Sequence, residues 1–231
     1  MKSKNLHYLF FAVLLTELLA IAFHRNDVHQ FVKPLLMVVL LLWFMTLSLK
    51  FSPLRYYIAA ALIFSWLGDV FLLLEEKSPS WFMAGLGSFL LAHVLYILFF
   101  LKIRNRKITK QPWNILIIVV VEGYAISLFA FLSPHIGNLK IPVAVYALVI
   151  ATMLVTAAHA FNKNTQQAGG FCIPGAALFV ISDSLLALNK FYHPFAAAGI
   201  CIMLTYGLAQ FAITKGSLLY LAKENKVSQI N

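Results

Sequence analysis

Residues 55–74 read RYYIAAALIFSWLGDVFLLL, an apolar segment that carries a single acid, Asp69, in its second half. A helix needs about 20 mostly apolar residues to cross the hydrocarbon core of a bilayer. A charged side chain at the centre of such a helix costs at least about 2.5–3.5 kcal/mol on insertion scales, so it is retained only with a partner or a use. The segment therefore predicts a transmembrane helix built around a buried carboxyl group.

The rest of the chain has the same apolar character. Of its 231 residues, 61% are hydrophobic and 11% are charged, whereas soluble domains have about 45–50% and about 25%. This composition excludes a soluble globular protein and leaves no room for a separate water-soluble catalytic domain. We expect an all-α, polytopic membrane bundle of eight transmembrane helices that forms one domain over residues 1–231. The expected spans lie near 7–23, 31–49, 55–74, 81–101, 113–132, 141–159, 171–189 and 195–214.

The net charge of +10 lies in the short links between spans, which is typical of a membrane protein and not of a nucleic-acid-binding protein. With a cytoplasmic N-terminus, 13 of the 18 lysines and arginines fall on the inner side and 5 on the outer side. This bias predicts that both termini are cytoplasmic, and the small size and basic ends are typical of a bacterial inner membrane protein. The first segment resembles a signal peptide, but it carries Glu17 and lacks a cleavage site, so we expect a true span.

Several classes of chemistry have no motif in this chain. Cys172 and Cys201 lie in apolar runs and predict no disulfide, and no zinc-ligand spacing, P-loop or dinucleotide fingerprint is present. We therefore expect no metal and no cofactor. The oligomeric state is left open.

Ionisable groups inside the spans are the candidate functional residues. Asp69 in the third span and Asp183 in the seventh both reach the outer half of the bilayer. Lys33 at the outer mouth of the second span and Tyr146 in the sixth are expected at the same level. Four of the eight acids lie inside spans: Glu17, Asp69, Glu122 and Asp183.

An internal repeat is one interpretation of the two aspartates. An offset of 114 residues superposes Asp69 on Asp183 and Leu72 on Leu186. Four helices separate the two aspartates, so the repeat would consist of two parallel four-helix halves.

A set of short motifs extends from the second span to the eighth. They are Lys33-Pro34, Ser65-x-x-Gly68-Asp69, Gly85-x-x-x-Phe89-x-x-x-His93-x-x-Tyr96, Tyr146 with Met153, Gly175-Ala176-x-x-Phe179-x-x-Ser182-Asp183, and Tyr206-x-x-x-Gln210. Their order and spacing resemble the YhhN/TMEM86 family. Animal members of that family are lysoplasmalogenases, which hydrolyse the vinyl ether of lysoplasmalogens to a fatty aldehyde and a glycerophospho-head group. The resemblance implies eight spans and this activity, with a lyso-phospholipid or a related ether lipid as substrate.

Two carboxyl groups suit this reaction. Protonation of the β-carbon of a vinyl ether gives an oxocarbenium ion, which water captures to form a hemiacetal that collapses to aldehyde and alcohol. A carboxyl group in apolar surroundings tends to keep its proton, while an ionised neighbour stabilises the cation and orients the water. We therefore expect one of Asp69 and Asp183 to be the acid and the other the base or stabiliser, with the assignment left open. Lys33 is expected to meet the lipid phosphate, and the other expected substrate-binding residues are His93, Tyr96, Tyr146, Ser182, Tyr206 and Gln210.

Other readings of the same residues stay open. Each aspartate could tie helices together through a serine, histidine or tyrosine, Lys33 could extend to the interface, and Glu17 is expected to make an interhelical contact. His159 is expected at the inner interface. A small-solute or proton-coupled transporter would also use intramembrane carboxylates, but it predicts broken helices in matching spans, and only the seventh span has an interruption, at Pro174 and Gly175. A non-catalytic lyso-lipid binder is the third alternative.

Overall fold

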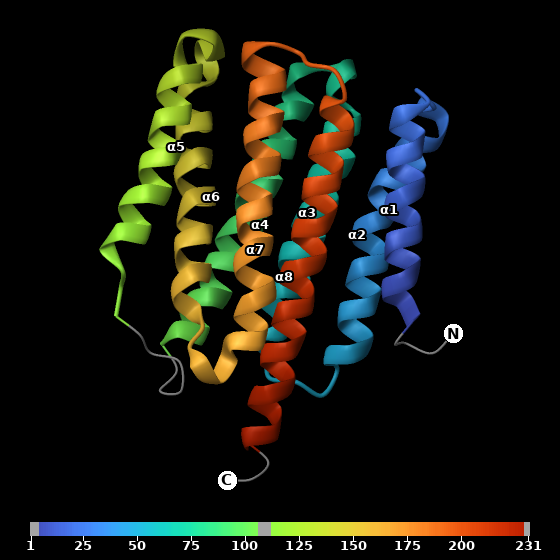
Figure 1. The fold of residues 1–231 in the computed structure, drawn as a ribbon. Helices are drawn as coiled ribbons and strands as arrows, with labels where there is room; N and C mark the ends of the chain where they lie inside the picture. Colours follow the sequence, from blue (N-terminus) through green and yellow to red (C-terminus); the bar gives the residue numbers. More distant parts are fainter. Residues whose placement is uncertain (1–4, 106–111, 229–231) are drawn as a thin grey trace.

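The computed structural model describes residues 5–105 and 112–228. Within these ranges the chain is all-α, as predicted, and its long helices run roughly side by side (Figure 1). The helices are α1 (Leu6–Ala22), α2 (Asn26–Ser48), α3 (Arg55–Leu73), α4 (Pro79–Arg104), α5 (Ile115–Ile136), α6 (Lys140–Ala160), α7 (Gln166–Ala187) and α8 (Ala198–Ser228). Residues Lys2, Lys4, Arg106, Lys107 and Lys110, which enter the predicted charge bias, lie outside the described ranges.

Six stretches of the described chain are long and apolar enough to cross a membrane. One of them, Ile115–Ala160, comprises α5, a short 3-10 turn and α6, and α1 is a shorter apolar helix of 17 residues. The protein is therefore an integral membrane protein. The face that α5 turns away from the bundle agrees with this, because large apolar side chains such as Ile115 and Leu116 are about 70% exposed there.

Three helices depart from the predicted bounds by five residues or more, and one of them is α7, which begins at Gln166 instead of near 171. α2 begins at Asn26 instead of near 31, since Asp27 in its first turn favours the helix N-terminus and the polar start is still helical. α8 continues to Ser228 instead of ending near 214, because residues beyond the apolar segment retain helix-forming side chains such as Lys223 and Glu224. Hydropathy therefore predicted where the spans lie and missed the polar turns that extend them.

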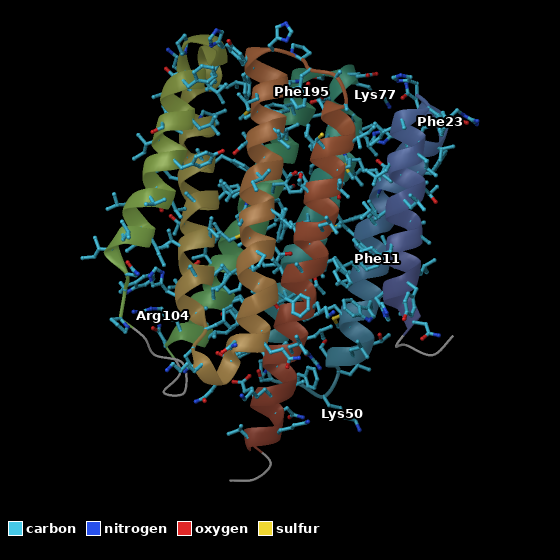
Figure 2. All side chains as sticks on the ribbon, in the orientation of Figure 1. Phe11, Phe23, Lys50, Lys77, Arg104 and Phe195 are labelled. Atoms are coloured by element: carbon cyan, nitrogen blue, oxygen red, sulfur yellow. The ribbon has the colours of Figure 1, made fainter. Side chains whose placement is uncertain are left out.

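α1 begins and α8 ends at the same end of the bundle, which we name the terminal end, and the opposite end is the far end (Figure 1). Lys50 and Arg104 lie at the terminal end, and Lys77 and Phe195 lie at the far end (Figure 2). α7 packs most extensively on α8, and α3 on α4. α5 lies at one edge of the bundle and α1 at the other (Figure 1).

The helix bounds repeat along the chain with the offset predicted from the two aspartates. Adding 114 to the bounds of α3 gives 169–187, and α7 spans Gln166–Ala187. The same shift takes α2 to 140–162, and α6 spans Lys140–Ala160. The packing between the halves repeats as well, since α4 of the first half packs on α6 of the second, and α8 of the second half packs on α2 of the first. These agreements support two parallel four-helix halves.

The expected interruption of the seventh span is absent. α7 is one continuous helix from Gln166 to Ala187, with Pro174 inside it. Prolines are tolerated within membrane helices because neighbouring helices and local adjustments satisfy the backbone groups that they release. The feature that could have favoured a transporter is therefore missing from both α3 and α7.

Candidate functional site

Tyr146 and Asp183 form a polar pair between α6 and α7. The Tyr146 hydroxyl donates a short hydrogen bond to Oδ2 of Asp183. Tyr146 is buried, whereas Asp183 is only partly buried. Asp183 lies in the last two turns of α7, so the pair is in the half of the bundle nearer the far end.

Two apolar clefts lie on either side of this pair. The α4 cleft opens between α3, α4, α6 and α7 and has a cavity volume of about 50 Å³, and the α5 cleft opens between α5, α6 and α7 and has a cavity volume of about 60 Å³. The residues shared by both clefts are Val143, Tyr146, Asp183 and Ala187. A carboxyl group reached from two apolar clefts suits a lipid whose reactive bond lies between two dissimilar parts.

Asp69 belongs to a second polar cluster, on the side of α3 that faces α8. Tyr206 donates a 2.7 Å hydrogen bond to its Oδ2, and Asp69 is 1% exposed. The charges of Lys33 and Glu17 both act on Asp69. Glu17 accepts a 2.6 Å hydrogen bond from, or shares a proton with, Nδ1 of His29, so it makes the expected contact between α1 and α2.

A network of neutral side chains lies one helical turn nearer the terminal end than this cluster. The Tyr96 hydroxyl donates a 2.6 Å hydrogen bond to Oε1 of Gln210, and Nε2 of Gln210 donates a 2.8 Å bond to the Ser65 hydroxyl. All three side chains are fully buried. The network thus joins α3, α4 and α8, and it satisfies the polar atoms of Gln210 that would otherwise be costly in an apolar interior.

An aromatic layer connects the two aspartate clusters. The ring of Tyr206 meets Phe179 edge-on at 5.5 Å, Phe179 meets His93 at 4.6 Å, and His93 meets Tyr146 at 5.4 Å. Phe89, which lines the α4 cleft, also packs edge-on against Tyr206 at 5.8 Å. Gly68 makes room for Phe89, because a Cβ at Gly68 would lie 2.6 Å from Cε2 of that ring.

His93 has unused hydrogen-bonding capacity within this layer. Its side chain is 0% exposed, and neither ring nitrogen has a partner among the described residues. Buried polar groups in native proteins are nearly always paired with protein or water. His93 is therefore a position at which water or a polar group of a ligand is expected to bind.

Of the four groups expected at one level, Tyr146 and Asp183 are hydrogen-bonded to each other, and the aromatic layer lies between this pair and Asp69. The charge of Lys33 acts on Asp69. Lys33 is not among the described residues that line either cleft. Position along a helix predicted the common depth of these groups, but it carried no information about the direction in which each side chain turns.

Two further expected residues have structural contacts. The Ser182 hydroxyl donates a 3.0 Å hydrogen bond to the carbonyl oxygen of Ile202, which ties α7 to α8. His159, in the last turn of α6, is buried, and its Nε2 accepts a 2.8 Å hydrogen bond from the backbone N–H of Asn114. Glu122 has a partner that its sequence context did not suggest, since it accepts a 3.0 Å hydrogen bond from Thr152 on α6.

Lys190 is a site residue that the sequence did not single out. It lines the α4 cleft together with Asp183 and lies seven residues further along the chain. That spacing, two helical turns, was the available signal, because it places both side chains on one helix face. In the part of the chain that the structure describes, no group of three or more His, Cys, Asp or Glu side chains is arranged to hold a metal ion.

Comparison with known proteins identifies the family of this chain. The model of the YhhN family matches residues 28–217, which include α3 to α7, most of α2 and α8, and both aspartate clusters. The chain belongs to the YhhN family. No solved structure matches it.

Relatives within the YhhN family carry the name lysoplasmalogenase. The human protein lysoplasmalogenase TMEM86B is 33% identical over 186 residues, which cover 80% of this chain and 72% of the human protein. A lysoplasmalogenase of Mycobacterium bovis is 31% identical over 167 residues, which cover 70% of this chain and 60% of the mycobacterial protein. Bovine lysoplasmalogenase TMEM86A is 32% identical over 169 residues, covering 68% of this chain and 62% of the bovine protein.

Proposed function

We propose that this protein is a membrane-embedded hydrolase that cleaves the vinyl ether bond of a lysoplasmalogen or a related lyso-ether lipid. In this proposal residues 1–231 form one domain of eight spans in a bacterial inner membrane, with the terminal end in the cytoplasm. Membership of a family whose named relatives are lysoplasmalogenases supports the reaction. The presence of a bacterial relative supports the location.

The observation that carries the proposal is the position of the Asp183 carboxyl between two apolar clefts. A lyso-ether lipid has one long hydrocarbon chain and one polar part, and the vinyl ether joins them. A substrate that lies across the α6 and α7 seam would place this bond beside Asp183, with one part in each cleft. A pure binding site would not need an acid at the junction.

In the proposed reaction, the Tyr146–Asp183 pair supplies and then takes back one proton. Asp183 in its protonated form gives its proton to the β-carbon of the vinyl ether, and the ether oxygen shares the positive charge that forms on the α-carbon. Water then attacks the α-carbon while the Asp183 carboxylate accepts the proton that the water loses, which gives a hemiacetal. The bond between the α-carbon and the glycerol oxygen then breaks as the hemiacetal hydroxyl loses its proton and the glycerol oxygen gains one, and the products are a fatty aldehyde and the glycerophospho-head group.

Tyr146 and His93 support these steps. The Tyr146 hydroxyl holds Oδ2 of Asp183, so it fixes the direction of the other carboxyl oxygen toward the bond. His93 packs against the Tyr146 ring, and its two unpartnered nitrogens suit it to hold the attacking water. Both residues thus act on the geometry of one proton donor and one water molecule.

Asp69 has a different role in this proposal. Asp69 is not among the described residues that line the clefts, Tyr206 donates a hydrogen bond to it, and the charge of Lys33 acts on it. We assign Asp69 to stabilising the positive charge of the transition state through the electric field of its carboxylate. In the resting protein the positive charge of Lys33 balances the charge of this carboxylate. Tyr96, Gln210 and Ser182 then hold the helices that position both clusters.

The test is aldehyde release from a lysoplasmalogen by the purified protein in detergent. Asp183→Asn should lower turnover by about 100-fold or more, which is the usual size of a general acid contribution, and Asp69→Asn should lower it less. Asp27→Asn, in an exposed ion pair with Arg25, is the matched control and should keep full turnover. Size-exclusion profiles check folding, and full turnover by Asp183→Asn would refute the assignment.

A further inference from the structure

One residue that lines the α4 cleft, Lys190, forms an ion pair with a residue outside the lining, Glu75. Lys190 belongs to the π-helical turn η5 (Leu188–Tyr192) that follows α7, and Glu75 belongs to the 3-10 turn η2 (Glu75–Lys77) that follows α3. Nζ of Lys190 lies 3.2 Å from Oε2 of Glu75 and 4.9 Å from the centre of the Phe82 ring. The two side chains are 39% and 35% exposed, so both can be reached from outside.

Among the described residues that line the α4 cleft, Asp183 and Lys190 are the charged side chains, and Glu75 pairs with Lys190 outside that lining. Lys190 lies seven residues after Asp183, which corresponds to about 10 Å along a helix at 1.5 Å per residue. Between them the cleft is lined by apolar side chains such as Leu86, Leu186 and Phe191. In a lyso-ether lipid the glycerol carbons separate the ether oxygen from the phosphate in the same order.

The α5 cleft differs in its charge. Among the described residues that line it, Asp183 is the one charged side chain, and the others include Leu128, Phe129 and Leu132. A hydrocarbon chain suits this cleft, whereas a phosphate would lose its hydration there without gaining a cation. The two clefts therefore distinguish the two ends of the lipid.

The chemistry of the ion pair points to a zwitterionic ligand. A partly exposed lysine and glutamate pair contributes little to stability and can exchange partners at small cost. Phosphate oxygens make stronger, charge-assisted hydrogen bonds with an ammonium group. Once Lys190 turns to a phosphate, the Glu75 carboxylate is left to bind a cationic amine on the same head group.

We propose that Lys190 and Glu75 form the head-group site of this protein, with Lys190 binding the phosphate and Glu75 binding the amine of a zwitterionic lyso-ether phospholipid. The hydrocarbon chain then lies in the α5 cleft. This inference rests on the proposed function for the position of the ether bond at Asp183. It assigns the phosphate to Lys190 in place of Lys33, whose charge acts on Asp69.

The test compares three 1-alkenyl substrates that differ only in the head group: glycerol alone, glycerol phosphate, and glycerol phosphoethanolamine. Lys190→Gln should raise the KM for both phosphate-bearing lipids by about tenfold, the usual effect of losing one charge-assisted hydrogen bond, and leave alkenyl glycerol unchanged. Glu75→Gln should raise the KM for the phosphoethanolamine lipid alone. Lys77→Gln, an exposed lysine of the same turn, is the matched control and should leave all three substrates unchanged.

Exchanging the charges of Lys190 and Glu75 distinguishes a head-group site from an ion pair with a purely structural role. Lys190→Glu combined with Glu75→Lys keeps an ion pair but removes the ammonium from the cleft wall. We expect the double variant to fold and to retain the raised KM for phosphate-bearing lipids. Recovery of the original head-group preference would show that the pair is structural and would overturn the proposal, as would an equal effect of Lys190→Gln on all three substrates.

A binding measurement keeps this inference separate from the proposed function. The 1-alkyl lyso-ether analogue with a phosphoethanolamine head group cannot be cleaved at a vinyl ether, and its affinity is measured with the wild type and Lys190→Gln. Weaker binding by Lys190→Gln together with no aldehyde from the wild type would support the head-group site and refute the hydrolase. Equal binding by the two proteins would refute the head-group site even if the wild type releases aldehyde.

Discussion

Tyr96 on α4 and Gln210 on α8 are joined by a 2.6 Å hydrogen bond, and 114 residues separate them along the chain. This separation equals the offset that relates the bounds of α3 to α7 and of α2 to α6. The bond therefore connects equivalent positions of the two halves of the bundle. It also lies beneath the Asp69 cluster, so it fixes the helices that hold Tyr206.

Tyr96→Phe should destabilise the protein by about 1 kcal/mol, because Oε1 of Gln210 would lose its buried donor. Unfolding in mixed micelles of rising denaturing-detergent fraction measures the change. The double variant Tyr96→Phe, Gln210→Leu should recover part of the loss, since it leaves no orphaned acceptor. Tyr8→Phe, at an exposed tyrosine, serves as the control, and an unchanged midpoint for Tyr96→Phe would show that the bond adds nothing.

His93→Phe should separate stability from activity. The phenyl ring can keep the edge-on contacts with Phe179 and Tyr146, while the two unpartnered buried nitrogens disappear. We expect an unfolding midpoint equal to or above that of the wild type and turnover lower by about 100-fold. His193→Phe, at an exposed histidine with an extended backbone, should change neither quantity, and full turnover by His93→Phe would exclude a role for the imidazole.

Gly68→Ala should destabilise the protein by about 1–3 kcal/mol, because the new methyl group meets the Phe89 ring within a packed interior. Gly87→Ala is a matched control, since a Cβ there has no heavy atom within 4 Å. Thermal unfolding in detergent compares the two variants. Combining Gly68→Ala with Phe89→Leu should restore much of the stability, and equal midpoints for the two single variants would contradict the packing argument.

Ala147→Trp should change the preferred length of the hydrocarbon chain. Ala147 lines the α5 cleft, so an indole there would occupy space proposed for the alkenyl chain. We expect the KM of long-chain substrates to rise by about tenfold, while short-chain substrates are affected less. Ala130→Trp, on the exposed side of α5, is the control, and an unchanged chain-length profile would place the chain elsewhere.

Positions along the helices were predictable from the sequence. The apolar segments located each helix, and counting from the segment ends placed Asp69 and Asp183 in the same half of the bundle. The bond between Tyr146 and Asp183 agrees with the expected shared level of the two groups. The all-α class follows from the same argument, because a membrane span must satisfy its backbone hydrogen bonds internally.

The directions of the side chains around the helices were not predictable. Most spans are apolar on every side, so their pattern does not reveal which face meets a neighbour. Two of the expected residues illustrate this, since the charge of Lys33 acts on Asp69 and the Ser182 hydroxyl donates to the carbonyl of Ile202. Lys190 was missed because it lies beyond the apolar segment, where its seven-residue spacing from Asp183 was the one available signal.

The contrast between the two clefts also bears on the fate of a reactive product. A fatty aldehyde is an electrophile that condenses with primary amines such as lysine side chains. The α4 cleft carries Lys190, whereas the described residues lining the α5 cleft include no lysine. An aldehyde formed at Asp183 and released through the α5 cleft would pass into the lipid phase without meeting a protein amine, so the enzyme would be protected from self-modification by the route its own product takes.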